Sequence, residues 1–340
     1  MRIDLAGWTR DATQGPAQDF LGLFERAEAL GFEGVWFSEF RAAGSAWPYP
    51  SPLLLAAALL ARTDRLRVGT SVLVLPLHHP LLLAEEIAQV DYQSNGRLDV
   101  GVGRGTDPGS LQALQVDPDT TRARFEQACR ILRSSLRGDA VGADDGAWQF
   151  APRTLSAITL QKPHPPMYVA GSTPDTLSFA LSEALPLLLS LEPSEAFQLQ
   201  RLDEVARQAG QGTAQLLAHS SLSRYVCIGT SQDDVRAQLQ ALWPLMQKRR
   251  CLNAVRRGTD PAAVPVMAVD EVLRTQFIYG TPQDCVEQIL ALERCTGVGQ
   301  LRCVFNANGL WTNSHAMTGM ELFAREVLPA LRQASPSGCD

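Results

Sequence analysis

Short apolar stretches alternate with longer amphipathic stretches along nearly the whole chain, and this alternation limits the possible folds. The short stretches have the length and composition of strands, and in the longer ones apolar residues recur every three or four positions, as on one face of a helix. The expected strands are residues 2–7, 33–39, 66–75, 97–103, 166–171, 185–190, 223–229 and 301–306. The expected helices are residues 16–32, 51–64, 79–96, 122–138, 174–184, 233–246 and 321–333.

Such alternation predicts a parallel sheet of the α/β class with its helices packed outside. Eight expected strands favour a closed (β/α)8 barrel, or TIM barrel, over the rival arrangement, an open doubly wound sheet. We expect one barrel domain over residues 1–334 and a disordered tail at 335–340.

Two segments interrupt the alternation and are expected to be insertions. Residues 138–160 contain "GDAVGADDGAWQFAP", which predicts a loop or a hairpin before the fifth strand. Residues 247–275 follow the seventh strand and carry basic residues among Pro, Gly and Ala. In a barrel, an insertion at this point stands at the catalytic mouth, where it can act as a lid.

The composition excludes several classes of protein. Of the 340 residues, 45% are hydrophobic, which is enough for a large core, and the net charge of −6 without a basic block argues against binding to nucleic acid. The most apolar run, 53–61, is much shorter than the ~18 residues of a membrane helix. The start of the chain does not resemble a signal peptide, and the 7 cysteines show no Cys-x-x-Cys spacing. These features predict a cytoplasmic protein.

The segment "GRLDVGVGRG" (96–105) is a strand that ends in glycines, with Arg104 among them. It is not a dinucleotide fingerprint, because position 106 is Thr where the third glycine should stand. The carboxyl ends of barrel strands are where active sites form. At such a position Arg104 either binds an anion such as phosphate or pairs with a neighbouring carboxylate, and its position alone does not separate these two roles.

A second candidate site is the turn in "VAGSTPDT" (169–176), between an expected strand and helix. Ser172 and Thr173 lie at the entrance of that helix, which is either an anion site or an ordinary helix cap. Glu39, at the end of the second strand, is a candidate active-site carboxylate that could equally anchor a loop. The adjacent His78 and His79 lack the spacing of metal ligands, so no metal site is predicted.

Residues 66–105, "LRVGTSVLVLPLHHPLLLAEEIAQVDYQSNGRLDVGVGRG", closely resemble the flavin-dependent luciferase-like monooxygenases, the bacterial luciferase superfamily. "ALGFEGVWFSE" (29–39), "QKPHPPMYVAGSTPDT" (161–176) and "GTPQDC" (280–285) fit the same family. The resemblance implies a barrel that binds reduced FMN from a separate flavin reductase. It also implies that molecular oxygen then forms a flavin C4a-hydroperoxide, which oxidises an organic small molecule, and secondary metabolism is the expected setting. Such proteins commonly form dimers, so a homodimer is expected.

The resemblance also implies the site residues. A cis peptide is expected at Ser71–Val72, and glycines 101, 103 and 105 would let the flavin approach the backbone. The expected cofactor-binding residues are Ser71, Val72, Gly103, Arg104, Gly105, Gly171, Ser172, Thr173 and Thr176.

The chain departs from the family where many members have Glu-His-His. Here the residues are Glu39, Phe40 and Arg41, so Glu39 and Phe40 are the candidate catalytic positions. The reactive cysteine of luciferase is also replaced, by Gly103. A luminescent reaction is therefore not expected. The alternatives are a deazaflavin (F420) oxidoreductase on the same barrel and a non-catalytic flavin-binding partner subunit.

Overall fold

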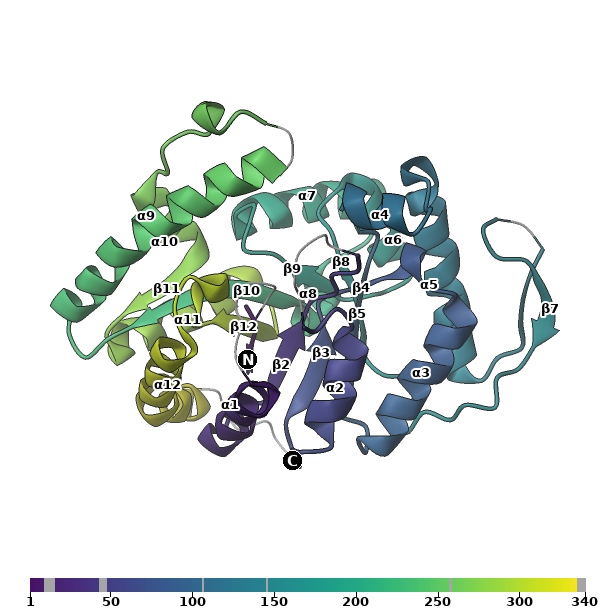
Figure 1. The fold of residues 1–340 in the computed structure, drawn as a ribbon, viewed down its shortest axis with the longest axis horizontal. Coiled ribbons are helices and arrows are strands. Elements are labelled where there is room, and N and C mark those ends of the chain that lie inside the picture. Colours follow the sequence, from purple (N-terminus) through teal and green to yellow (C-terminus); the bar gives the residue numbers. More distant parts are fainter. Residues whose placement is uncertain (9–15, 43–47, 106, 145, 257–258, 335–340) are drawn as a thin grey trace.

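Eight parallel strands close into a barrel, with helices around it (Figure 1). The computed structural model describes residues 1–8, 16–42, 48–105, 107–144, 146–256 and 259–334, so the expected tail at 335–340 lies outside the described residues. The barrel strands are β1 (Arg2–Leu5), β2 (Gly34–Phe37), β3 (Arg67–Thr70), β5 (Leu98–Gly103), β8 (Met167–Ala170), β9 (Leu187–Leu189), β10 (Ser221–Ile228) and β12 (Gln300–Val304). Each overlaps one of the eight expected strands, which confirms the (β/α)8 barrel.

The barrel closes through β10, which pairs with β9 on one edge and with β12 on the other. Ser221 lies opposite Leu188 of β9 and Gln300 of β12, and Gln300 in turn lies opposite Arg2 of β1. A closed ring of parallel strands has no free edge, so the open doubly wound sheet is excluded.

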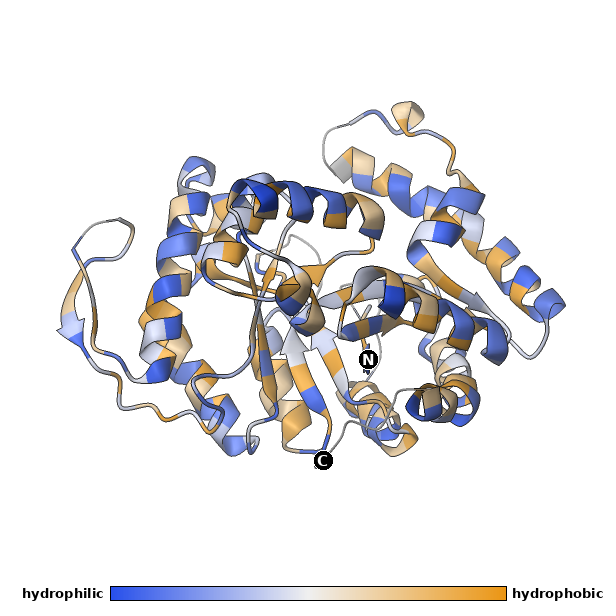
Figure 2. Cartoon of the chain, turned by 180° about the vertical axis from the view of Figure 1, so that it is seen from behind, coloured by the Kyte–Doolittle hydropathy of each residue, from blue (hydrophilic) through white to orange (hydrophobic). Residues whose placement is uncertain are grey.

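The helices bury their apolar faces against the barrel. Figure 2 shows hydrophobic and hydrophilic residues side by side on most of them. Local signals define two helix ends, since Ser51 caps α2 by accepting a hydrogen bond from Leu54 N and Gly31 ends α1 with φ 92°. None of the helices in the described ranges is long and apolar enough to cross a membrane. The helices are α1 (Ala17–Leu30), α2 (Pro52–Leu60), α3 (Pro80–Gln93), α4 (Pro108–Ala113), α5 (Thr121–Arg137), α6 (Pro174–Ser182), α7 (Glu195–Gln208), α8 (Ala214–His219), α9 (Gln232–Arg256), α10 (Val269–Gln276), α11 (Pro282–Thr296) and α12 (Asn313–Ala334).

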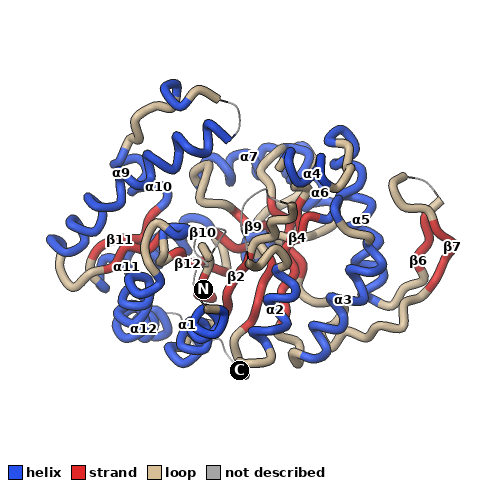
Figure 3. The backbone as a smooth tube through the Cα atoms, viewed as in Figure 1, coloured by secondary structure: helices blue, strands red, loops and turns tan. Residues whose placement is uncertain are grey.

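The two expected insertions differ in how well they were predicted. The first forms an antiparallel hairpin, β6 (Val141–Ala143) and β7 (Phe150–Arg153), which projects from the barrel (Figure 3). The second is helical for much of its length. Helix α9 continues to Arg256, and α10 covers the end of the segment. Gln247, Lys248, Arg249 and Arg250 have long unbranched side chains that favour helix, and Leu252 and Ala254 are good helix formers as well.

An additional strand, β11 (Phe277–Gly280), pairs with the outer end of β10, where Tyr225 lies opposite Phe277. It was not predicted. The expected third strand, 66–75, is also divided. Strand β3 ends at Thr70, the Ser71–Val72 peptide is cis as expected, and β4 (Leu73–Val74) then pairs with β5.

The glycines of β5 make room for the protein's own chain. A Cβ atom at Gly101 would lie 2.0 Å from Thr70 O, and one at Gly103 would lie 2.7 Å from Val72 Cγ2. One at Gly105, where φ is +72°, would lie 2.3 Å from Val74 Cγ1. These glycines therefore allow close packing of β5 against the segment around the cis peptide.

We predict that Gly101→Ala lowers the free energy of unfolding by about 1–3 kcal/mol, because the new methyl group meets a backbone oxygen that cannot move aside. The matched control is Gly22→Ala in α1, where an added Cβ meets nothing within 4 Å. This control should stabilise the protein by about 0.5–1 kcal/mol through helix propensity. Urea unfolding of both variants measures the difference, and equal stabilities would contradict the packing argument.

Candidate functional site

The carboxyl ends of the barrel strands bring most of the predicted site residues to one edge. Ser71 follows β3, and its carbonyl oxygen accepts a hydrogen bond from Ser38 Oγ at 2.8 Å. The Ser71 hydroxyl accepts one from Arg302 Nη1 at 3.0 Å. Val72 packs on a small apolar cluster at the top of the barrel interior, and Ala170 and Tyr225 pack on the same cluster. These three side chains therefore share the floor of the barrel mouth.

Arg104 directly follows β5 and is partly exposed. Among the described residues, no carboxylate or other acceptor lies within hydrogen-bonding distance of its guanidinium. Pairing with a neighbouring carboxylate, the alternative to anion binding, is therefore not seen in this part of the chain. Strand β5 pairs with β8, with Val102 opposite Val169, so Arg104 and Gly171 leave neighbouring strands at the same edge.

The turn between β8 and α6 contains a helix cap, which the sequence offered as the alternative to an anion site. Thr173 Oγ1 accepts a hydrogen bond from Thr176 N at 3.4 Å and lies 2.9 Å from Thr176 Oγ1. Gly171 has φ +144°, and a Cβ atom there would lie 2.8 Å from Thr176 Cγ2. Capping occupies only one of the backbone N–H groups at this helix end, so the cap and an anion site are compatible.

Two arginines that were not predicted lie at the same turn. Arg122, in the first turn of α5, donates to Thr176 Oγ1 at 3.1 Å and to Asp175 O at 2.5 Å. Arg201 of α7 donates to Ser172 O at 3.2 Å. A cation in the first turn of a helix lies next to the positive end of the helix dipole, which is unfavourable. The position of Arg122 at the start of α5 was therefore a sequence signal that its side chain serves another element.

Glu39 is completely buried and anchors the segment after the cis peptide. Its carboxylate accepts hydrogen bonds from Val74 N at 2.7 Å and Arg41 Nε at 2.7 Å, and His78 Nε2 lies 2.9 Å from Oε1. Burial alone would raise the pKa of Glu39. The hydrogen bond and the charge of His78, together with the hydrogen bonds from Val74 N and Arg41, outweigh burial and lower the pKa. The loop-anchoring interpretation accounts for all of these contacts.

Phe40 lies beside this anchor, half-buried, and lines a small cavity of about 190 Å³ together with Val74, Gly105 and Leu111. The position therefore presents an apolar ring to this cavity. His78 contacts Glu39 and belongs to the anchor. In the described part of the chain, no three His, Cys, Asp or Glu side chains are grouped as metal ligands.

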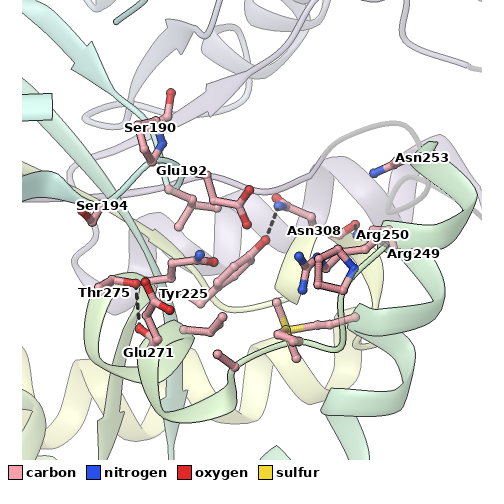
Figure 4. A pocket seen from close by; sticks show the side chains of 18 of the residues that line it. Ser190, Glu192, Ser194, Tyr225, Arg249, Arg250, Asn253, Glu271, Thr275 and Asn308 are labelled. Carbon is pink, nitrogen blue, oxygen red and sulfur yellow. Dashed lines mark hydrogen bonds between the residues drawn. The ribbon is translucent and has the colours of Figure 1, made fainter. Parts of the chain in front are cut away.

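A larger cavity, of about 870 Å³, opens next to the barrel mouth, between the end of β9 and helices α9 and α10 (Figure 4). It lies within the usual size range of small-molecule sites. None of the predicted site residues lines it. Its lining includes Ser190 after β9, Tyr225 of β10 and Asn308 after β12, so it borders the same edge of the barrel.

Comparison with known proteins identifies the family of the chain. The model of the family described as "Luciferase-like monooxygenase" matches residues 4–298, most of the chain. The chain belongs to this family. It is 28% identical to the 4-hydroxyprotoasukamycin monooxygenase of Streptomyces nodosus subsp. asukaensis, over 91% of this chain and 85% of that one. It is 25% identical to the alkanal monooxygenase alpha chain of Photorhabdus luminescens, over 90% and 89%.

Solved structures agree with the barrel of this luciferase-like monooxygenase. The oxygenating constituent of 3,6-diketocamphane monooxygenase from Pseudomonas putida, in complex with FMN, superposes with a TM-score of 0.74 at 19% identity, covering 97% of this chain and 98% of that one. An F420-dependent secondary alcohol dehydrogenase with an F420–acetone adduct gives a TM-score of 0.73 at 16% identity, covering 97% and 99%. At these identities the likeness shows the fold only.

We predict that Glu39→Gln lowers the free energy of unfolding at pH 7 by about 2 kcal/mol, because an amide cannot accept all of the charge-assisted hydrogen bonds. The pKa of Glu39 is lower in the folded state than its ordinary value of 4.5. The stabilisation that the ionised carboxylate gives the folded protein is therefore fully present above pH 4.5, and it is lost as the pH falls through the lowered pKa of the folded state. The gap between wild type and variant should therefore narrow below pH 4.5.

The control is Glu326→Gln on α12, whose side chain is 48% exposed. It should change stability little. Urea unfolding between pH 3 and 7 measures both variants. A gap for Glu39→Gln that stays constant over this range would contradict the assignment of an ionised anchor.

Proposed function

We propose that this luciferase-like enzyme is a monooxygenase that binds reduced FMN and uses molecular oxygen to hydroxylate, or insert oxygen into, an organic small molecule. The observation that carries the proposal is Arg104, which stands at the barrel edge beside the β8–α6 turn with no partner among the described residues. A guanidinium at this position fits a phosphate group. Reduced FMN, when bound, would supply oxygen activation as its C4a-hydroperoxide.

The proposed phosphate site consists of Arg104, the turn of Gly171, Ser172 and Thr173, and Thr176. The backbone N–H groups at the start of α6 favour an anion, and Gly171 leaves room for it. Arg122, which is paired with Glu126 in α5, fixes the Thr176 hydroxyl. The phosphate would therefore be held by the charge of Arg104 and by hydrogen bonds from the turn.

The proposed ring site lies beside the Ser71–Val72 peptide, where Val72 faces Gly103 and Val74 faces Gly105. Val72 offers an apolar surface at the floor of the mouth, and the Glu39 anchor fixes the adjacent segment through Val74. We assign Glu39 to positioning. Phe40 would keep water from the reacting centre, since a phenyl ring excludes solvent but transfers no proton.

The segment 247–275 is proposed to cover the substrate. Its residues form much of one wall of the 870 Å³ cavity, as a cover would, namely Arg249, Arg250, Asn253, Pro265, Val266, Met267, Ala268, Glu271, Val272 and Thr275. A flavin reductase that supplies the reduced cofactor and a homodimer are proposed as well, because the family resemblance implies both.

FMN is preferred to F420 as the cofactor, although each is bound by a neighbour with the same fold. Two relatives that match 90% and 91% of this chain are named monooxygenases. The non-catalytic partner subunit remains the second candidate, and the observation that favours it is Phe40 in place of histidine.

We predict that Arg104→Gln binds reduced FMN roughly ten- to a hundredfold more weakly, because it loses a charge-assisted bond to the phosphate. Its affinity for reduced riboflavin, which lacks the phosphate, should not change. Arg236→Gln on the exposed face of α9 is the control. Anaerobic titration measures all three proteins, and an unchanged ratio of FMN to riboflavin affinity would remove Arg104 from the site.

A second prediction concerns Phe40. Because no imidazole stands at this position, the protein with reduced FMN, oxygen and a long-chain aldehyde should emit no more light than free flavin does. Phe40→His is the informative variant, since it restores the titrating group. Sustained light from the wild type would overturn the proposal of non-luminescent oxygenation.

A further inference from the structure

The 870 Å³ cavity contains a hydrogen-bond donor and an acceptor without partners. Tyr225 points its hydroxyl group into the cavity, and Asn308 Nδ2 donates to the phenolic oxygen at 3.0 Å (Figure 4). That bond uses a lone pair of the oxygen and leaves its proton to donate elsewhere. The described residues provide no acceptor for it.

Gln276, the last residue of α10, supplies the acceptor. It lines the same cavity, is 9% exposed, and its Oε1 atom is buried with no hydrogen-bond partner among the described residues. An unpaired buried amide oxygen is costly, so native proteins rarely leave one without a ligand or water. The next residue, Phe277, lies opposite Tyr225 across β10 and β11, so the acceptor directly precedes the position that pairs with the donor.

The buried part of the remaining lining is suited to an uncharged apolar body, and the charged residues Glu192, Arg249, Arg250 and Glu271 line the cavity around it. Met246 and Met267 are buried in the wall, with Val272 and Leu310 beside them, and thioether side chains adapt to irregular shapes. Glu192 and Glu271 are exposed. Arg249 donates to backbone oxygens of Ala307 and Asn308. The buried polar groups facing the cavity are therefore the neutral ones.

We propose that this cavity binds the organic substrate through a hydroxyl group, which accepts a hydrogen bond from Tyr225 and donates one to Gln276 Oε1. A hydroxyl group is the simplest neutral group that does both. The substrate class is a hydroxylated, otherwise apolar molecule, such as a phenol. The inference rests on the proposed oxygenase function, because Tyr225 and Val72 pack on the same cluster and so place the bound molecule next to the proposed ring site.

Three probes of similar shape separate the two hydrogen bonds. 2-Naphthol donates and accepts, 2-methoxynaphthalene only accepts, and 2-ethylnaphthalene does neither. Wild-type protein should prefer 2-methoxynaphthalene to 2-ethylnaphthalene, and 2-naphthol to 2-methoxynaphthalene, each by about two- to tenfold. Fluorescence titration of the probes gives the affinities.

Each variant should remove one preference. Tyr225→Phe should bind 2-methoxynaphthalene and 2-ethylnaphthalene equally. Gln276→Met should bind 2-naphthol no better than 2-methoxynaphthalene. In Asn308→Asp the Tyr225 hydroxyl should donate its proton to the new carboxylate. The preference for 2-methoxynaphthalene over 2-ethylnaphthalene should therefore also disappear, although Tyr225 is intact. Tyr279→Phe, on β11 outside the cavity lining, is the matched control and should behave as wild type.

Absence of either preference in the wild type, or its survival in the corresponding variant, would overturn the proposal. The affinity for reduced FMN is measured on the same proteins. Failure of the wild type to bind FMN would refute the oxygenase function, whereas normal FMN binding without probe discrimination would refute the substrate class only.

Discussion

The buried guanidinium of Arg302 holds the upper part of the barrel together. From β12 it donates to Ser221 Oγ of β10, to Ser71 Oγ after β3 and to Leu189 O of β9, and it lies 5.7 Å from the ring of Trp36 on β2. Burial lowers its pKa to about 10, so it stays charged at neutral pH. A buried charge that loses a partner is strongly destabilising, and this fixes the strands relative to one another.

The same contacts connect the two parts of the proposed site. Ser71 begins the cis peptide segment, on which the flavin ring is proposed to rest. Leu189 precedes Ser190, which lines the large cavity. Beyond Arg302, the glycines of β5 and the Glu39 anchor fix the position of the segment around Val72 and Val74 from its other sides. The mouth of the barrel is therefore rigid next to the proposed ring site, while the adaptable side chains of Met246 and Met267 line the cavity.

Much of the barrel could be predicted from the sequence because its strands are short apolar runs between clear helix signals. All eight were found, as were the hairpin and the position of the cis peptide. Helix α9 was predicted too short because its charged end resembles a loop, and β11 was missed because "FIYG" is brief and follows directly after the insertion. The roles of Gly101, Gly103 and Gly105 depend on contacts with the preceding strand, which no local pattern reveals.

The residues of the proposed flavin and substrate sites could be predicted from the sequence only where a family motif marks them. Arg104 and the turn at Ser172 carry such a motif, whereas Tyr225 and Gln276 read as an ordinary strand residue and helix residue. Their importance comes from tertiary contacts, namely the bond from Asn308 and the burial of an unpaired amide oxygen. Arg122 was recoverable in principle, since a cation at a helix start is out of place unless it serves another element.

The central claim, that this barrel holds reduced FMN and controls its reaction with oxygen, is tested most directly by rapid mixing. Protein saturated with reduced FMN is mixed with oxygenated buffer, and the flavin spectrum is followed until oxidised FMN appears. The account predicts an intermediate absorbance distinct from oxidised FMN that persists much longer than it does with free flavin. Reoxidation at the rate of free reduced FMN, without such an intermediate, would contradict it.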